Sequence, residues 1–101
     1  MLIIGHRGAP HEFLENGWKA FDAAIEAGSH RIELDVHLTR DHHLVIMHDH
    51  TLNRTTRGKG LVSNYTRKEL ESIPLRDGSA IPFLDEALEK LLPAVELNIE
   101  I

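Results

Sequence analysis

The chain has 101 residues and a net charge of −5, with 11 Lys and Arg residues against 16 Asp and Glu residues. This acidic balance excludes a general nucleic-acid binder and a polybasic membrane anchor. The hydrophobic share of 42% is too high for a disordered chain, and no run reaches the ~18 apolar residues that span a membrane. The sequence has no cysteine, so redox chemistry does not constrain its compartment. Since it has no signal-peptide pattern, we expect one cytoplasmic domain over residues 1–101.

The first part of the chain is typical of a strand, a loop and a helix. A short apolar run of Leu2, Ile3 and Ile4 predicts a buried strand that ends in a Gly-flanked polar turn. Apolar residues then recur at helical spacing over residues 15–27, and Gly28 supplies a stop signal. This order predicts the opening of a βα unit.

Two runs of alternating polar and apolar residues follow, over residues 31–39 and 43–49. The connection between them is too short for a parallel crossover, so it predicts an antiparallel hairpin. A two-residue turn of Asp41 and His42 would bring the apolar faces of both runs together. A slip of one residue would mix these faces, so the pattern favours this register.

The predicted register has a chemical consequence. It places Asp35 opposite His48, about 5 Å away at Cβ, with Glu33 on the same face of the strand. Such a face is either a solvated polar surface or a hard-cation site beside an acid or base. The turn after the first strand favours the second interpretation, because His6 and Arg7 could meet a bound phosphate there.

The second half of the chain begins with a polar, Gly-punctuated excursion over about residues 50–80. Within it, Thr66 and Glu69 have the spacing of a capping box, which marks the start of a helix. The later segments repeat the helical and then the alternating pattern. We predict helices over residues 66–73 and 84–92, and a final strand over residues 94–101.

A series of short motifs covers nearly the whole chain. In order they include His6-Arg7-Gly8, Glu15-Asn16, Glu33-Leu34-Asp35-Val36, His48-Asp49, Leu52 with Arg54-Thr55-Thr56, and Asn98-Ile99-Glu100-Ile101. This series resembles the amino-terminal part of the glycerophosphodiester phosphodiesterase family, within the phospholipase C-like phosphodiesterase superfamily. The resemblance implies an α/β fold, a TIM-type (β/α) barrel, of which this chain would form a partial barrel with a hairpin and a small insertion. A whole barrel of this type takes ~250 residues.

The resemblance also implies a metal-dependent hydrolytic site. In the family, a divalent cation, Ca²⁺ or Mg²⁺, is bound at the positions of Glu33, Asp35 and Glu100. The general acid and base correspond to His6 and His48. The residue pattern by itself already indicates four of these residues, whereas Glu100 is assigned by the resemblance alone.

The implied substrate is a small-molecule glycerophosphodiester, hydrolysed to sn-glycerol 3-phosphate and an alcohol. Arg7 would hold the phosphate, and Glu15 and Asn16 would line the substrate site. One alternative is a related enzyme that acts on lysophospholipids or inositol phospholipids, and another is a truncated, catalytically silent fragment that binds a divalent cation. Because a partial barrel exposes a sheet edge, we also expect self-association or docking onto a carboxy-terminal half.

Overall fold

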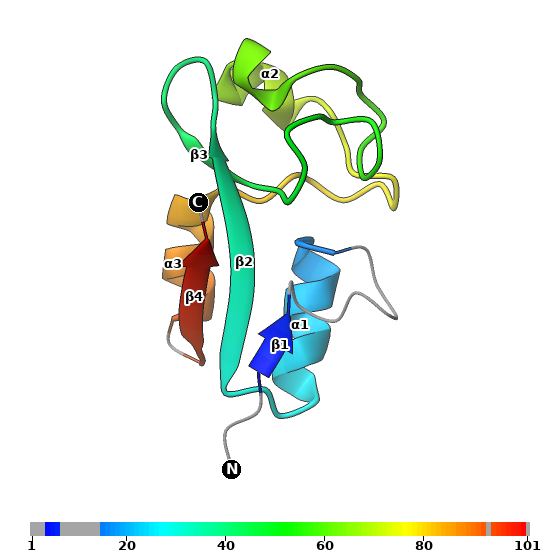
Figure 1. The fold of residues 1–101 in the computed structure, drawn as a ribbon. Helices are drawn as coiled ribbons and strands as arrows, with labels where there is room; N and C mark the ends of the chain where they lie inside the picture. The colour runs from blue at the N-terminus through cyan, green and yellow to red at the C-terminus, as the bar shows by residue number, and fades with distance from the viewer. Residues whose placement is uncertain (1–3, 7–14, 93, 101) are drawn as a thin grey trace.

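The computed structural model describes residues 4–6, 15–92 and 94–100. Its elements in chain order are β1 (Ile4–His6), α1 (Trp18–Glu26), β2 (Arg31–Leu38), β3 (Leu44–Ile46), the 3₁₀ helix η1 (Val62–Asn64), α2 (Arg67–Glu71), α3 (Leu84–Leu91) and β4 (Glu96–Glu100). Figure 1 shows how they are arranged. None of the helices in this described part is long and apolar enough to cross a membrane.

Strand β2 forms the centre of a four-stranded sheet. β1 and β4 both run parallel to β2 and pair with its first residues, so they lie on opposite sides of it, as Figure 1 shows. β3 runs antiparallel and pairs with the last residues of β2. The alternation of parallel strands and helices confirms the α/β class expected from the sequence.

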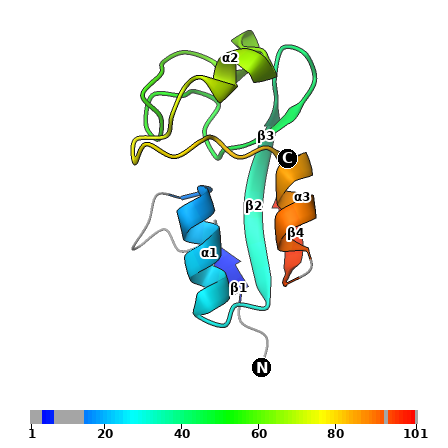
Figure 2. The ribbon, with the colours of Figure 1, turned by 180° about the vertical axis from the view of Figure 1, so that it is seen from behind.

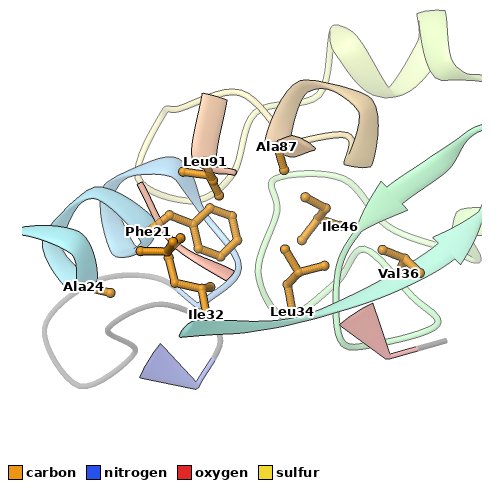
Figure 3. Close-up of a cluster of buried hydrophobic side chains, with 9 residues drawn as sticks. Phe21, Ala24, Ile32, Leu34, Val36, Ile46, Ala87 and Leu91 are labelled. Carbon is orange, nitrogen blue, oxygen red and sulfur yellow. The ribbon is translucent and has the colours of Figure 1, made fainter. Parts of the chain in front are cut away.

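The main hydrophobic core lies between the sheet and the helices α1 and α3. Alternation along β2 directs Ile32, Leu34 and Val36 into this core, where each would stabilise the fold by about 1.5–3 kcal/mol. Both helices cover this one face of the sheet, as the view from behind shows (Figure 2). The opposite face therefore carries Glu33 and Asp35. Other core residues are Phe21, Ala24, Ile46, Ala87, Leu91 and Val95 (Figure 3).

The polar excursion between β3 and α3 has a hydrophobic cluster of its own. Val45 and Met47 reach this cluster from the hairpin, and its other members are spread over residues 52–83, where no continuous helical or strand periodicity indicates a core. Single β-bridges join distant parts of the excursion, such as Thr56 with Leu75. The segment is therefore packed rather than loose. The members of this second cluster are Val45, Met47, Leu52, Val62, Leu70, Leu75, Ile81 and Phe83.

The hairpin of β2 and β3 exists, but its predicted register is wrong. Ile46 pairs with Val36, and the Met47 N–H donates to the carbonyl oxygen of Asp35 at 2.9 Å. Asp35 therefore lies opposite Met47 and not opposite His48. β3 is also shorter than the predicted strand, because it ends at Ile46.

A three-residue connection, residues 40–42, explains the changed register. The buried Thr39 hydroxyl accepts a hydrogen bond from the His43 N–H at 2.9 Å and donates one to Asp41 Oδ1 at 2.6 Å. His42 takes the left-handed conformation, with a φ of 67°. Because the loop has one residue more than predicted, each side chain of β3 points to the face of the sheet opposite to the predicted one.

Candidate active site

The carboxyl ends of the parallel strands β1, β2 and β4 meet at one edge of the sheet. Pairing places His6 opposite Glu33, and Glu100 opposite Asp35. Paired strands lie ~4.8 Å apart, and residues two apart on a strand share a face. The register thus brings four of the predicted site residues to neighbouring backbone positions, whereas Arg7 lies outside the described residues.

The donors at this edge are carboxylates, the ligands that Ca²⁺ and Mg²⁺ prefer. Within the described ranges, no three His, Asp or Glu side chains are gathered closely enough to hold a metal ion. A neighbouring amide supports the fit of an oxygen-binding cation. Asn16 Oδ1 is buried and has no hydrogen-bond partner among the described residues, while Asn16 Nδ2 donates to Asp35 Oδ2 at 3.2 Å. Buried oxygens without a partner are uncommon, so this edge can accept further donors or a cation.

Asn16 reaches this edge from the loop that precedes α1. It lies directly before Gly17, the N-cap of the helix, and it is only 3% exposed. Its φ of 55° is in the left-handed region, which Asn tolerates better than most residues. The turn places Asn16 beside Asp35, and it places the adjacent Glu15 near the excursion.

His48 lies two residues after β3, and its orientation is set by hydrogen bonds. His48 Nδ1 lies 2.9 Å from Asp49 Oδ1. Hydrogen bonds from Arg54 and His48 hold the pKa of the Asp49 carboxyl well below its ordinary value, so this carboxylate only accepts. His48 Nδ1 therefore carries the proton, and in the neutral ring Nε2 remains available as an acceptor.

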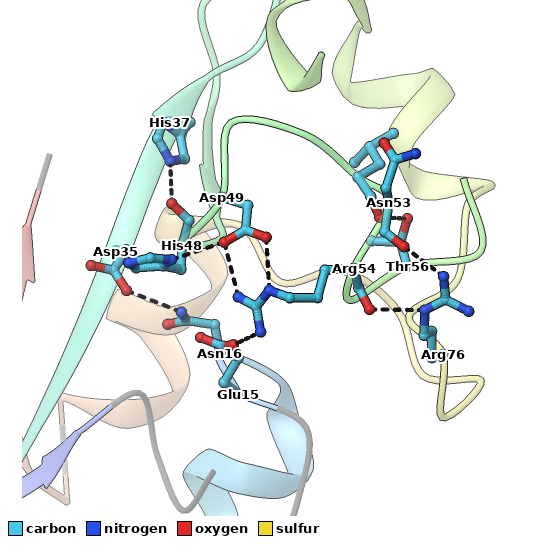
Figure 4. Close-up of polar contacts among 11 residues, drawn as sticks. Glu15, Asn16, Asp35, His37, His48, Asp49, Asn53, Arg54, Thr56 and Arg76 are labelled. Atoms are coloured by element: carbon cyan, nitrogen blue, oxygen red, sulfur yellow. Dashed lines mark hydrogen bonds and ion pairs between the residues drawn. The ribbon is translucent and has the colours of Figure 1, made fainter. Parts of the chain in front are cut away.

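Arg54 connects the histidine to the loop before α1. Its Nε and Nη2 donate to the two oxygens of Asp49 at 2.8 and 2.9 Å, and its Nη1 donates to the Glu15 carboxylate. The two carboxylates raise the pKa of the Arg54 guanidinium above its ordinary value. Figure 4 shows these contacts and the bond from Asn16 to Asp35.

The patterns in the sequence indicate no role for Asp49 or Arg54. Both belong to the motifs that carry the family resemblance, so a signal was present. Arg54 reaches the loop before α1 through a contact with Glu15, which lies 39 residues away in the sequence. No local pattern in the sequence indicates such a pairing.

The sheet and the site edge define the amino-terminal part of a TIM-type barrel, as the comparison with solved structures shows. A glycerophosphodiester phosphodiesterase from Agrobacterium tumefaciens superimposes with a TM-score of 0.94 and 36% identity, over 98% of this chain and 46% of that one. A phosphodiesterase from Oleispira antarctica, solved with the product sn-glycerol-3-phosphate, gives a TM-score of 0.90 and 32% identity, over 98% of this chain and 43% of that one.

Sequence comparison names the family. The family model "Glycerophosphoryl diester phosphodiesterase family" matches residues 6–101, and the chain belongs to this family. It is 41% identical, over 95% of its length, to a glycerophosphodiester phosphodiesterase from Caldanaerobacter subterraneus subsp. tengcongensis, of which it covers 40%. The chain thus spans about 40% of the length of the curated relatives it matches. The predicted family and the predicted partial barrel are both confirmed.

Proposed function

We propose that the chain carries part of a metal-dependent phosphodiesterase site, which hydrolyses glycerophosphodiesters to sn-glycerol 3-phosphate and an alcohol. The observation that carries this proposal is the meeting of His6, Glu33, Asp35 and Glu100 at one edge of the sheet. Family membership supports it, and so does the product held by the solved relative from Oleispira antarctica.

The carboxylates of Glu33, Asp35 and Glu100 would hold the divalent cation, Ca²⁺ or Mg²⁺. When bound, such a cation neutralises the negative charge that develops on the phosphoryl oxygens. Arg7 adds a guanidinium to the same task, because it follows the strand that ends beside Glu33.

Two histidines would move the protons of the reaction. His48 holds its Nδ1 proton against Asp49, so its Nε2 can take a proton from a nucleophile or return one to a leaving oxygen. His6 ends β1 opposite Glu33 and would be the second acid or base. Asn16 Oδ1 would accept a hydrogen bond from a substrate hydroxyl, which would satisfy its buried oxygen.

An activity assay on the 101-residue chain tests this function. We expect release of sn-glycerol 3-phosphate from glycerophosphocholine in the presence of Ca²⁺ or Mg²⁺. His48→Ala should lower the rate by about 10²–10⁴-fold, the usual contribution of an acid or base. The matched control is His43→Ala, which removes an exposed histidine near the hairpin turn and should leave the rate unchanged. Equal rates for wild type and His48→Ala would contradict the proposal.

A second candidate is a silent fragment that binds a cation and associates with itself or with a carboxy-terminal half. This candidate is favoured by the length of the chain, about 40% of its curated relatives. Calorimetric titration with Ca²⁺ or Mg²⁺, carried out beside the hydrolysis assay, separates the two. Cation binding without any release of sn-glycerol 3-phosphate would support the silent fragment.

A further inference from the structure

We propose that Arg54 is a positioning residue of the site, which holds Asp49 and Glu15 together. Through Asp49 it fixes the ring of His48. This inference rests on the proposed function, because that function makes His48 an acid or base. In this role Arg54 orients the site, and the excursion holds Arg54 in place.

The Arg54 guanidinium contacts two carboxylates at once. Arg54 uses three nitrogens on two carboxylates, with Nε and Nη2 on the two oxygens of Asp49 and Nη1 on Glu15. A two-pronged contact of this kind fixes the plane of the Asp49 carboxylate, which a single ammonium cannot do. The exposed ion pair of Arg31 and Glu96, by contrast, joins its guanidinium to a single carboxylate.

Arg54 and His48 share one oxygen of Asp49. Asp49 Oδ1 lies 2.9 Å from Arg54 Nη2 and 2.9 Å from His48 Nδ1. The arginine therefore determines where the acceptor of the histidine lies. The peptide of His48 is held as well, because its carbonyl oxygen lies 2.9 Å from His37 Nε2.

Through Glu15, Arg54 also reaches the sheet edge that carries Asp35. The Glu15 side chain is only 10% exposed, and the next residue, Asn16, donates to Asp35. Arg54 thus joins the loop after β3 to the loop before α1. This connection holds the histidine and the carboxylate edge in one arrangement.

The excursion holds the backbone of Arg54 in place. The Arg54 carbonyl oxygen accepts from Arg76 Nε at 2.8 Å, and the buried Thr56 hydroxyl donates to the Leu52 carbonyl oxygen at 2.7 Å. Leu52 is fully buried in the second cluster. The packed excursion therefore acts as a rigid support for the arginine.

The test is the tautomer of His48 in the 101-residue chain, read from long-range ¹H–¹⁵N correlation spectra at a pH where histidines are neutral. We expect the Nδ1–H form in the wild type. Arg54→Gln should shift the ratio of the two His48 tautomers toward the Nε2–H form by about fivefold. This is less than the full contribution of one hydrogen bond to a charged acceptor. Arg54→Lys should shift the tautomer ratio in the same direction, because lysine loses the two-pronged contact even though it keeps the charge.

The matched control is Arg31→Lys. Arg31 also places two nitrogens on a carboxylate, that of Glu96, but at the other end of β2. This control should leave the His48 tautomer unchanged. A His48 ratio unaltered by both substitutions of Arg54 would overturn the proposal.

A second pair of variants tests the route through Asp49 and remains informative if Arg54→Gln fails to fold. Asp49→Asn alone should shift the tautomer as Arg54→Gln does, and Arg54→Lys added to Asp49→Asn should cause no further shift. An additional shift in the double variant would contradict the route. Because these spectra require no turnover, an inactive wild type with the expected shifts would refute the proposed function alone. An active wild type without them would refute the positioning role alone.

Discussion

Asn16 combines a left-handed backbone with a buried side chain at the edge of the site. Its φ is 55° and its exposed fraction is 3%. The conformation turns the chain into α1, and the side chain donates to Asp35 at 3.2 Å. Residues of this kind store strain where a site needs a fixed orientation.

We predict that Asn16→Ala lowers the free energy of unfolding more than Asn16→Gly does. Both substitutions remove the hydrogen bond to Asp35, but only alanine pays the steric cost of the left-handed conformation. The difference should be about 1 kcal/mol in favour of glycine, measured by urea denaturation. Equal stabilities of the two variants would show that the turn does not require this conformation.

Asp49 makes the fold sensitive to acid. Because Arg54 and His48 hold its folded-state pKa below the ordinary value of 3.8, its ionised form stabilises the protein above that pH. This contribution is lost as the pH falls below 3.8 toward the lowered pKa. Comparing wild type with Asp49→Asn by urea denaturation should give a difference of about 1 kcal/mol near neutral pH, which shrinks below pH 3.8. A difference that grows as the pH falls would have the wrong sign.

The helices α2 and α3 show how elements begin. The N-cap of α2 is Thr66, whose hydroxyl accepts from the Glu69 N–H at 3.3 Å, while Glu69 accepts from the Thr66 N–H at 2.9 Å. The N-cap of α3 is Phe83, which has no side-chain oxygen, so only Glu86 contributes a capping bond, accepting from the Phe83 N–H at 3.0 Å. The Phe83 side chain is buried in the second cluster, so it packs against the core and does not cap the N-terminus of α3.

At the element scale, we predict that Thr66→Ala lowers the free energy of unfolding by about 1 kcal/mol, the usual effect of losing an N-cap. Thr66→Ser is the matched control, because it keeps the hydroxyl that accepts from Glu69. Thermal unfolding followed by circular dichroism would measure both variants. An alanine variant as stable as the serine variant would mean that the cap does not support α2.

The α-helices and the strands could be predicted, because periodicity and capping signals are local. The 3₁₀ helix η1 could not, and Gly5 and His6, which were predicted in a turn, belong to β1. The alternation of β2 likewise placed Glu33 and Asp35 on one face, and the structure agrees. The register of the hairpin could not be predicted. It depends on the buried Thr39 hydroxyl, which lengthens the loop by one residue. The contact between Arg54 and Glu15 escaped prediction because it joins distant segments.

In the described part of the chain, β2 is the centre of an open sheet with α1 and α3 on one face. β4 pairs with β2 and, within the described residues, with no other strand. Its Ile99 side chain is 38% exposed, and Leu92 before it is 50% exposed. An unpaired edge with apolar side chains favours pairing with another chain.

We therefore predict that the chain self-associates, with a mass that rises with concentration in light scattering. Ile99→Lys should reduce association, because charge on an edge strand opposes strand pairing. Leu88→Lys on α3 is the matched control, since Leu88 is also 38% exposed. A monomeric wild type, or equal association of Ile99→Lys and wild type, would contradict a role for the β4 edge.

The most direct test of the central claim is the metal dependence of glycerophosphocholine hydrolysis by the 101-residue chain. We predict that a chelator abolishes release of sn-glycerol 3-phosphate and that Ca²⁺ or Mg²⁺ restores it. Asp35→Asn should not be restored by either ion, whereas the control Glu96→Gln, at the opposite end of the parallel pairing, should behave as wild type. Release that persists in the chelator, or that is equal in Asp35→Asn and wild type, would contradict the account.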